Sequence, residues 1–147
     1  MTCTFFGHRD APQKIEPILK STLTYLIEEE NVNLFYVGNN GNFDRMVIGI
    51  LKQLKEKYPH IRYSIVLAYI PKKETEENYD LTIYPEAIEC VPRKYAIPER
   101  NRWMISKSDY AVTYVNSAGN SLKYSEFAKI NGLIVINLAE KKEAEQI

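Results

Sequence analysis

The sequence has little that would support a disulfide-rich or metal-binding protein. Its 147 residues include two cysteines, Cys3 and Cys90, and two histidines, His8 and His60. Two cysteines cannot build a disulfide framework, and so few ligand-type residues argue against a zinc site. We therefore expect no metal and no cofactor. Cys3 lies in an apolar run, which predicts a buried small hydrophobic side chain.

Long apolar runs and an excess of one charge are also missing. Even the longest apolar runs are too short for a membrane-spanning helix. The N-terminus lacks a basic region followed by a signal-like apolar stretch. Acidic and basic residues number 19 each, so no global field would attract nucleic acid or an anionic membrane. We expect a cytoplasmic protein with no membrane partner, and the charge balance argues against nucleic acid as a partner.

The sequence does contain short apolar runs that alternate with longer amphipathic runs. The runs read as strands are 2–6, 34–37, 61–70, 110–115 and 133–138, and helical spacing follows in 15–27, 43–54, 99–108 and 122–131. This alternation implies right-handed crossovers and one mostly parallel sheet. The predicted fold class is α/β, a Rossmann-like three-layer sandwich of about five strands with helices on both faces. The length fits one domain, 1–139, followed by a charged tail, 140–147.

The stretch 71–98 interrupts this alternation. It holds four prolines and the acidic segment 74–80, which predicts a long excursion with a short strand around 87–91. Long ordered loops in compact domains are often lids or binding loops, and a plain surface insertion is an equally good interpretation here.

Three loops leave the predicted strands toward helices: 7–10, 38–44 and 116–121. In open parallel sheets, ligands bind beyond the carboxyl ends of the strands, where the strand order reverses. Free amides and the helix dipole at such loops favour an anion. The sequence therefore predicts a ligand site formed by these three loops.

The second loop is the most suggestive one. Gly38 and Gly41 allow a sharp turn and close ligand approach, and Asn39 and Asn40 add hydrogen-bond donors. Asp44 is placed to accept a ribose hydroxyl or to cap neighbouring amides. The loop is neither a Walker loop nor a dinucleotide GxGxxG. Taken alone, it favours an ordinary turn with a capping aspartate.

The other candidates are charged or titratable residues at corresponding places. After Gly7, His8 can donate to a ligand or exchange a proton, and Arg9 offers a planar fork to phosphate. Arg100 and Glu126 form a hypothetical working pair, in which the arginine holds phosphate and the carboxylate binds ribose hydroxyls or stabilises an oxocarbenium ion. Structural roles for His8 and Arg9, and a solvated pair of Arg100 and Glu126, are the alternatives.

Three blocks carry a family resemblance: FFGHRD at 5–10, VGNNGNFD at 37–44, and the block from PERNRWM to INL, 98–138. By these blocks the sequence resembles the SLOG superfamily, the Rossmann-like group that includes the Smf/DprA proteins and the LOG (Lonely Guy) phosphoribohydrolases. It is most similar to small bacterial SLOG proteins that open with an FFGHR-type strand end. The resemblance covers roughly 3–138.

The resemblance implies roles for particular residues. Arg100 resembles the family's catalytic, phosphate-contacting arginine, Glu126 its catalytic glutamate, and Ser117, Gly119 and Asn120 its phosphate-binding loop. That loop is PGGxGT in LOG enzymes and NSAGNSLK here. The spacing from Gly119 to Glu126 is about one residue longer than in the enzymes, a change that turns a helical side chain by about 100°.

Together these features predict binding of a nucleotide or nucleotide-derived small molecule, by a sensor or ligand-binding module. Nucleotide-type ligands and homodimers are what the resemblance implies. The alternative is an N-glycosidic hydrolase acting on a nucleoside 5′-monophosphate, and a third hypothesis is an interaction subunit with a vestigial crevice. The predicted ligand-binding residues are Gly7, His8, Arg9, Gly38, Asn39, Asn40, Gly41, Asp44, Arg100, Ser117, Gly119 and Asn120, with Arg100 and Glu126 catalytic if the protein is an enzyme.

Overall fold

The chain folds around one parallel sheet of six strands in the order β4-β3-β2-β1-β5-β6. The computed structural model describes residues 1–69 and 82–140. The strands are β1 (Thr2–Gly7), β2 (Leu34–Val37), β3 (Arg62–Val66), β4 (Thr82–Ile83), β5 (Tyr110–Tyr114) and β6 (Ile134–Asn137). The helices are α1 (Glu16–Glu29), α2 (Gly41–Lys57), α3 (Glu86–Glu89), α4 (Ala96–Ser106) and α5 (Asn120–Ile130).

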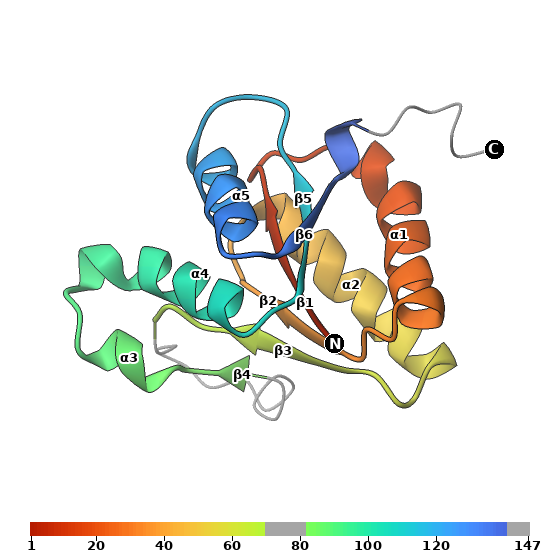
Figure 1. Cartoon of the computed structure of the whole chain (residues 1–147), viewed down its shortest axis with the longest axis horizontal. Helices are drawn as coiled ribbons and strands as arrows, with labels where there is room; N and C mark the ends of the chain where they lie inside the picture. The colour runs from red at the N-terminus through yellow and green to blue at the C-terminus, as the bar shows by residue number, and fades with distance from the viewer. Residues whose placement is uncertain (70–81, 141–147) are drawn as a thin grey trace.

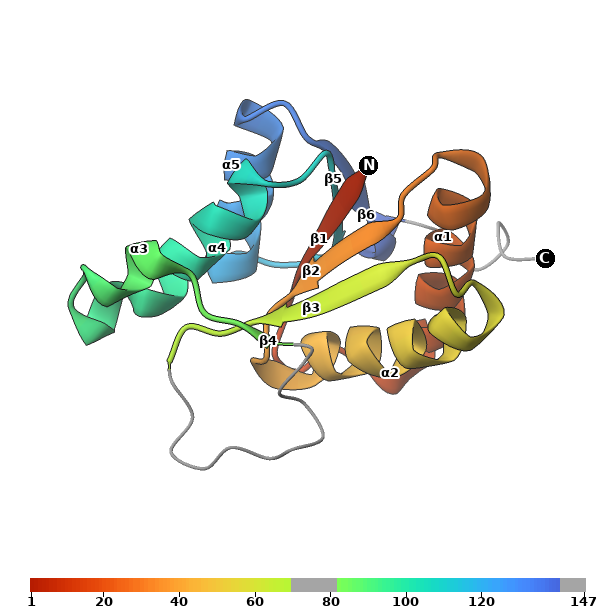
Figure 2. The ribbon, with the colours of Figure 1, turned by 90° about the horizontal axis from the view of Figure 1, so that it is seen from below.

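The helices form two layers, one on each face of the sheet. Helices α1 and α2 cover one face, and α4 and α5 cover the other (Figures 1 and 2). Along β1 the side chains alternate, so that Phe5 packs with the α1–α2 layer and Phe6 with the α4–α5 layer. This arrangement confirms the predicted Rossmann-like α/β sandwich, with one strand more than the five expected.

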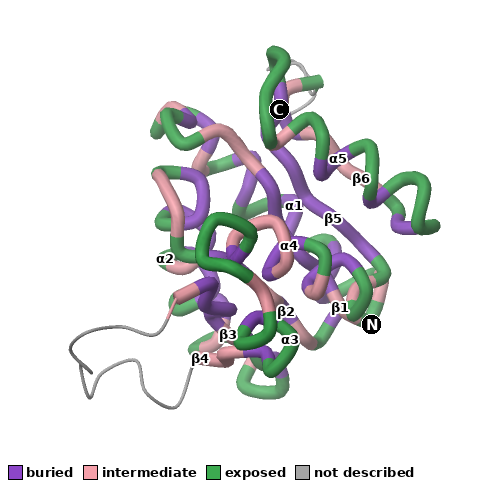
Figure 3. The backbone as a smooth tube through the Cα atoms, turned by 90° about the vertical axis from the view of Figure 1, so that its left-hand side faces the viewer, coloured by how far each residue is buried: buried purple, intermediate pink, exposed green. Residues whose placement is uncertain are grey.

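Burial follows the hydrophobic periodicity that predicted the elements. The tube in Figure 3 is buried along β5 and alternates between buried and exposed along the helices. All five residues of β5 are buried, as a central strand covered on both faces requires. Cys3 is buried in the α1–α2 core, as predicted, and burial raises the pKa of its thiol. The apolar face of α2 contributes the fully buried side chains Phe43, Ile50 and Leu51.

The excursion between β3 and α4 differs from its prediction. The short strand expected around 87–91 is wrong: residues 86–89 form α3, which begins directly after Pro85. Proline fixes a φ suited to the residue before a helix, and the extra strand instead uses the β-branched pair Thr82–Ile83 beside β3. The third strand ends at Val66. The acidic segment 74–80 and tail residues 141–147 lie outside the described residues.

The strand order creates one topological switch, at β1. From β1 the chain adds β2, β3 and β4 on one side, and then crosses to place β5 and β6 on the other side. The carboxyl ends of β1 and β5 therefore point to the crevice where the loops diverge. Among the described residues, no helix is long and apolar enough to cross a membrane.

Candidate functional site

A cavity with a volume of about 620 Å³ lies at this switch. We call it the main cleft. Its walls come from the end of β1, the start of α2, the start of α4 and the first turns of α5. The polar residues that line it are His8, Arg9, Asn40, Asp44, Lys94, Arg100, Asn101, Asn120, Ser121, Lys123 and Tyr124. Loops predicted from separate parts of the sequence thus share one cavity.

Arg100 occupies the buried side of the main cleft, only 2% exposed. Its Nε donates to Asn101 Oδ1 at 2.8 Å, and its Nη2 donates to Asn40 Oδ1 at 2.9 Å. Its Nη1 donates to the Val66 carbonyl at 3.1 Å and to Asn39 Oδ1 at 3.4 Å. The guanidinium therefore ties the end of β3 and the β2–α2 loop to α4.

Gly38 allows a close approach of Arg100 to the β2–α2 loop. A Cβ on Gly38 would lie 2.8 Å from Arg100 Nη1 and 3.0 Å from Asp44 Oδ2. At these distances a larger residue at this position would have to displace the Arg100 guanidinium. The space that a side chain at Gly38 would occupy is taken by the Arg100 guanidinium.

Asp44 is buried in the first turn of α2 and borders the main cleft. Its Oδ2 accepts the Asn40 amide at 3.0 Å, which is the capping role considered for it from the sequence. Burial raises the pKa of Asp44 to about 6, although the Asn40 hydrogen bond and the charges of Arg100 and Arg9 act to lower it. Burial likewise lowers the pKa of Arg100, against the opposing effect of Asp44. The two groups are thus electrostatically coupled inside the protein.

Three exposed cations belong to the lining of the main cleft. Arg9, Lys94 and Lys123 are all exposed and line it. Within residues 1–69 and 82–140, no carboxylate forms an ion pair with any of them. Beside Lys123, Asn120 and Ser121 belong to the first turn of α5, where free backbone amides add partial positive charge. The cleft is therefore suited to an anion.

Two more glycines serve packing. Gly41 has φ +90°, and a Cβ there would lie 2.7 Å from the Cα of Arg9. A Cβ on Gly7 would lie 2.3 Å from the ring of Phe43. The Asn42 amide donates to the Arg9 carbonyl at 2.8 Å. These contacts fix the β1 and β2 loops against each other, which holds Arg9 at the cleft.

His8 connects β1 to the loop after β5. Its Nε2 accepts the Asn116 amide at 3.1 Å and lies 3.5 Å from Ser117 Oγ. A nitrogen that accepts a backbone N–H carries no proton, so the ring proton belongs on Nδ1. His8 lines the main cleft, and its hydrogen bond to the Asn116 amide positions the β5–α5 loop. In that loop, Gly119 immediately precedes the first residue of α5.

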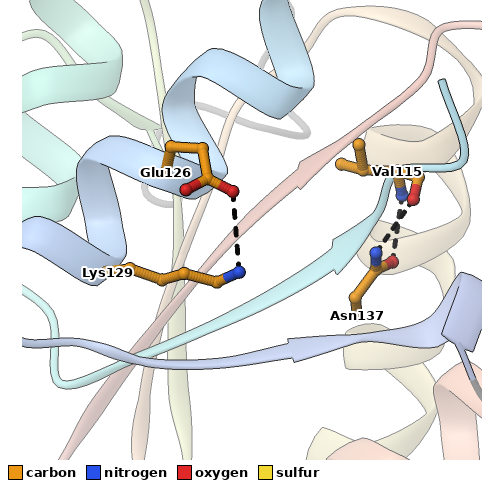
Figure 4. A network of polar contacts seen from close by, with 4 residues as sticks. All are labelled: Val115, Glu126, Lys129 and Asn137. Carbon is orange, nitrogen blue, oxygen red and sulfur yellow. Dashed lines mark hydrogen bonds and ion pairs between the residues drawn. The ribbon is translucent and has the colours of Figure 1, made fainter. Parts of the chain in front are cut away.

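Glu126 lies elsewhere. It borders a second cavity of about 390 Å³ between α5 and the ends of β5 and β6, together with Asn116 and Ser117. Figure 4 shows its carboxylate directed to Lys129, one turn along α5, at 3.6 Å. In the same view Asn137 bridges to the backbone of Val115. The structure thus does not bring Glu126 into the main cleft with Arg100, in keeping with the longer spacing from Gly119.

The predicted set of ligand-binding residues lacks five polar residues that line the main cleft: Lys94, Asn101, Ser121, Lys123 and Tyr124. Lys94 and Lys123 stand among interleaved charges, where nothing in the sequence marks them. Tyr124 is 8% exposed and stacks on Phe6 with ring centroids 5.7 Å apart. Its helical spacing from Asn120, one turn earlier, is the signal that would have placed it on the same wall.

Among the described residues, no group of three histidine, cysteine, aspartate or glutamate side chains could hold a metal ion. A comparison with models of protein families finds no match, and a comparison with curated proteins finds none either. The resemblance to SLOG proteins therefore stays a prediction, and the function has to be argued from the main cleft.

Proposed function

We propose that the main cleft binds a nucleotide or a nucleotide-derived small molecule, and that the protein is a sensor or ligand-binding module. The observation that carries this proposal is the set of three exposed cations without an ion-pair partner in the described chain, Arg9, Lys94 and Lys123, around a cleft at the topological switch. Unpaired cations beside a helix N-terminus favour a phosphate.

Size and lining support a ligand with an aromatic or sugar portion as well as a phosphate. The volume of about 620 Å³ falls within the usual range of small-molecule sites. The same cavity is lined by Phe6, Met104 and Tyr124, which offer apolar surface for a base. Asp44 offers an acceptor for a hydroxyl or amino group. The main cleft thus offers cations to a phosphate, an acceptor to a sugar hydroxyl and apolar surface to a base.

Calorimetric titration with nucleoside monophosphates, ADP-ribose and NAD tests the proposal. We expect saturable one-to-one binding of at least one of them, weakened in Arg9→Gln and unchanged in Arg45→Gln, a control arginine on α2 that does not line the main cleft. Flat titrations across the panel would refute nucleotide binding. Mass spectrometry of small molecules that copurify with the protein tests the same point without choosing a ligand.

The alternative, an N-glycosidic hydrolase that uses Arg100 with Glu126, gains no support from this geometry. The two side chains line different cavities, and the Arg100 donors are largely engaged within the protein. We therefore propose binding without turnover as the function.

A further inference from the structure

Three asparagine side chains surround the Arg100 guanidinium. Asn39, Asn40 and Asn101 each direct Oδ1 toward it. A guanidinium can only donate hydrogen bonds, so each amide must present its oxygen to the arginine. The amide nitrogen of each asparagine consequently faces away from Arg100.

Two of these amide nitrogens belong to residues that line the main cleft, Asn40 and Asn101. Asn101 is only 7% exposed, and no acceptor in the described part of the chain takes a hydrogen bond from either Nδ2. Neither nitrogen is sealed inside the protein, because Thr113 Oγ1 is the one fully buried side-chain polar atom without a partner among the described residues. Both Nδ2 groups are therefore accessible and free to donate a hydrogen bond to a ligand in the main cleft.

Arg100, in contrast, is close to saturated. Its hydrogen bonds to Asn101, Val66, Asn39 and Asn40 engage four of the five donors of a guanidinium. To bind a phosphate bidentately, it would have to break contacts that hold α4 to the β2–α2 loop. Its geometry suits an internal tie better than a ligand contact.

We propose that the Nδ2 groups of Asn40 and Asn101 bind the phosphate oxygens of the ligand, and that Arg100 is a positioning residue that orients both amides. This inference rests on the proposed function, since it assigns the phosphate to particular atoms of the same cleft. Neutral amide donors supply direction, while Arg9 and Lys123 at the opening supply charge.

The test is Asn101→Asp, which keeps an oxygen for Arg100 but replaces the outward NH₂ by a second, negatively charged oxygen. We expect AMP affinity to fall at least tenfold, with the urea midpoint no lower than that of the wild type. Asn42→Asp, the same charge change on an exposed residue at the start of α2, should alter AMP affinity less than about threefold. Equal effects of the two variants would refute the assignment.

Adenosine, which lacks the phosphate, provides the second arm. Its affinity should change by less than about twofold in Asn101→Asp, and an equal loss for adenosine and AMP would show that the amides do not serve the phosphate. A wild type that binds no nucleotide would overturn the proposed function. In that case inorganic phosphate replaces AMP as the probe. Phosphate should shift the side-chain NH₂ signals of Asn40 and Asn101 in ¹⁵N NMR spectra, while the Arg100 Nε–H signal persists. Unshifted amide signals would overturn the inference itself.

Discussion

The main cleft and the second cavity flank the same β5–α5 loop, yet their charges are arranged in opposite ways. In the second cavity Glu126 and Lys129 are both more than half exposed and neutralise each other at 3.6 Å. In the main cleft a buried carboxylate, Asp44, and a buried guanidinium, Arg100, lie beneath cations that have no ion-pair partner in the described chain. An exposed, neutralised pair contributes little to stability or binding, whereas a buried polar network is costly unless each member is held in place.

This difference in charge pairing distinguishes the candidate site from the rest of the surface. The main cleft holds cations that have no carboxylate partner in the described chain, whereas in the second cavity Glu126 and Lys129 pair with each other. Substitutions in the two cavities, each with a matched control, test this contrast.

The largest expected effect is the loss of Arg100. In Arg100→Met, three asparagine oxygens and the Val66 carbonyl lose their donor, and Asp44 loses a neighbouring positive charge. We expect the free energy of unfolding to fall by about 3–5 kcal/mol in urea denaturation at pH 7, because breaking a buried charge network leaves an uncompensated charge. Arg102→Met, on the exposed side of the same helix, should cost less than about 1 kcal/mol.

A second substitution distinguishes the loss of electrostatic coupling from a general packing defect. Adding Asp44→Asn to Arg100→Met removes the uncompensated carboxylate, and stability should partly recover. If the double variant is as unstable as the sum of the two single variants, the electrostatic coupling of Arg100 and Asp44 is not real.

The next effect is a pH dependence carried by Asp44. Its pKa is about 6 in the folded protein against 3.8 as the ordinary value, so the folded state holds the proton more tightly. This contribution to stability is therefore complete below pH 3.8 and is lost as the pH rises to about 6, a total of about 3 kcal/mol. Asp44→Asn abolishes it.

Urea denaturation from pH 4 to pH 7.5 measures this dependence. The stability of Asp44→Asn relative to the wild type should rise with pH across this range and level off above about pH 7. A difference that stays constant with pH would show that Asp44 is ionised normally, and would make the floor of the main cleft no different from the second cavity.

The sequence predicted the fold because hydrophobic periodicity is a local property. The apolar faces of α1 and α2 and the buried strand β5 needed no knowledge of distant residues. The loop positions followed from the rule for parallel sheets. The segment after β3 was harder to predict, because Pro85 places the start of α3 where the sequence pattern predicted a strand.

The site was predicted only in outline, since side-chain burial depends on contacts between distant segments. Nothing local shows that Gly38 packs against Arg100, or that Arg100 is buried while Arg9 is exposed. The direction of Glu126 depends on where α5 starts, and a shift of one residue turns the side chain by about 100°. Residue types were therefore predictable, but their partners were not.

A smaller effect distinguishes two lysines on α5. Lys123→Gln removes a cation from the main cleft and should weaken AMP binding about fivefold, or about 1 kcal/mol, with a flatter dependence on salt concentration. Lys129→Gln makes the same change in the second cavity and should alter AMP affinity less than twofold. Calorimetry at two salt concentrations measures both, and equal losses would mean that only overall charge matters.

The smallest expected effect is that of Glu126→Gln. The substitution removes an exposed ion pair, so stability should change by less than about 0.5 kcal/mol and AMP affinity by less than twofold. Chromatography of AMP incubated with the wild type should detect no free adenine, because Glu126 does not line the main cleft. Adenine release that disappears in Glu126→Gln would contradict this contrast directly. It would mean that the second cavity carries the chemistry and that the β5–α5 loop must move to bring Glu126 to the ligand.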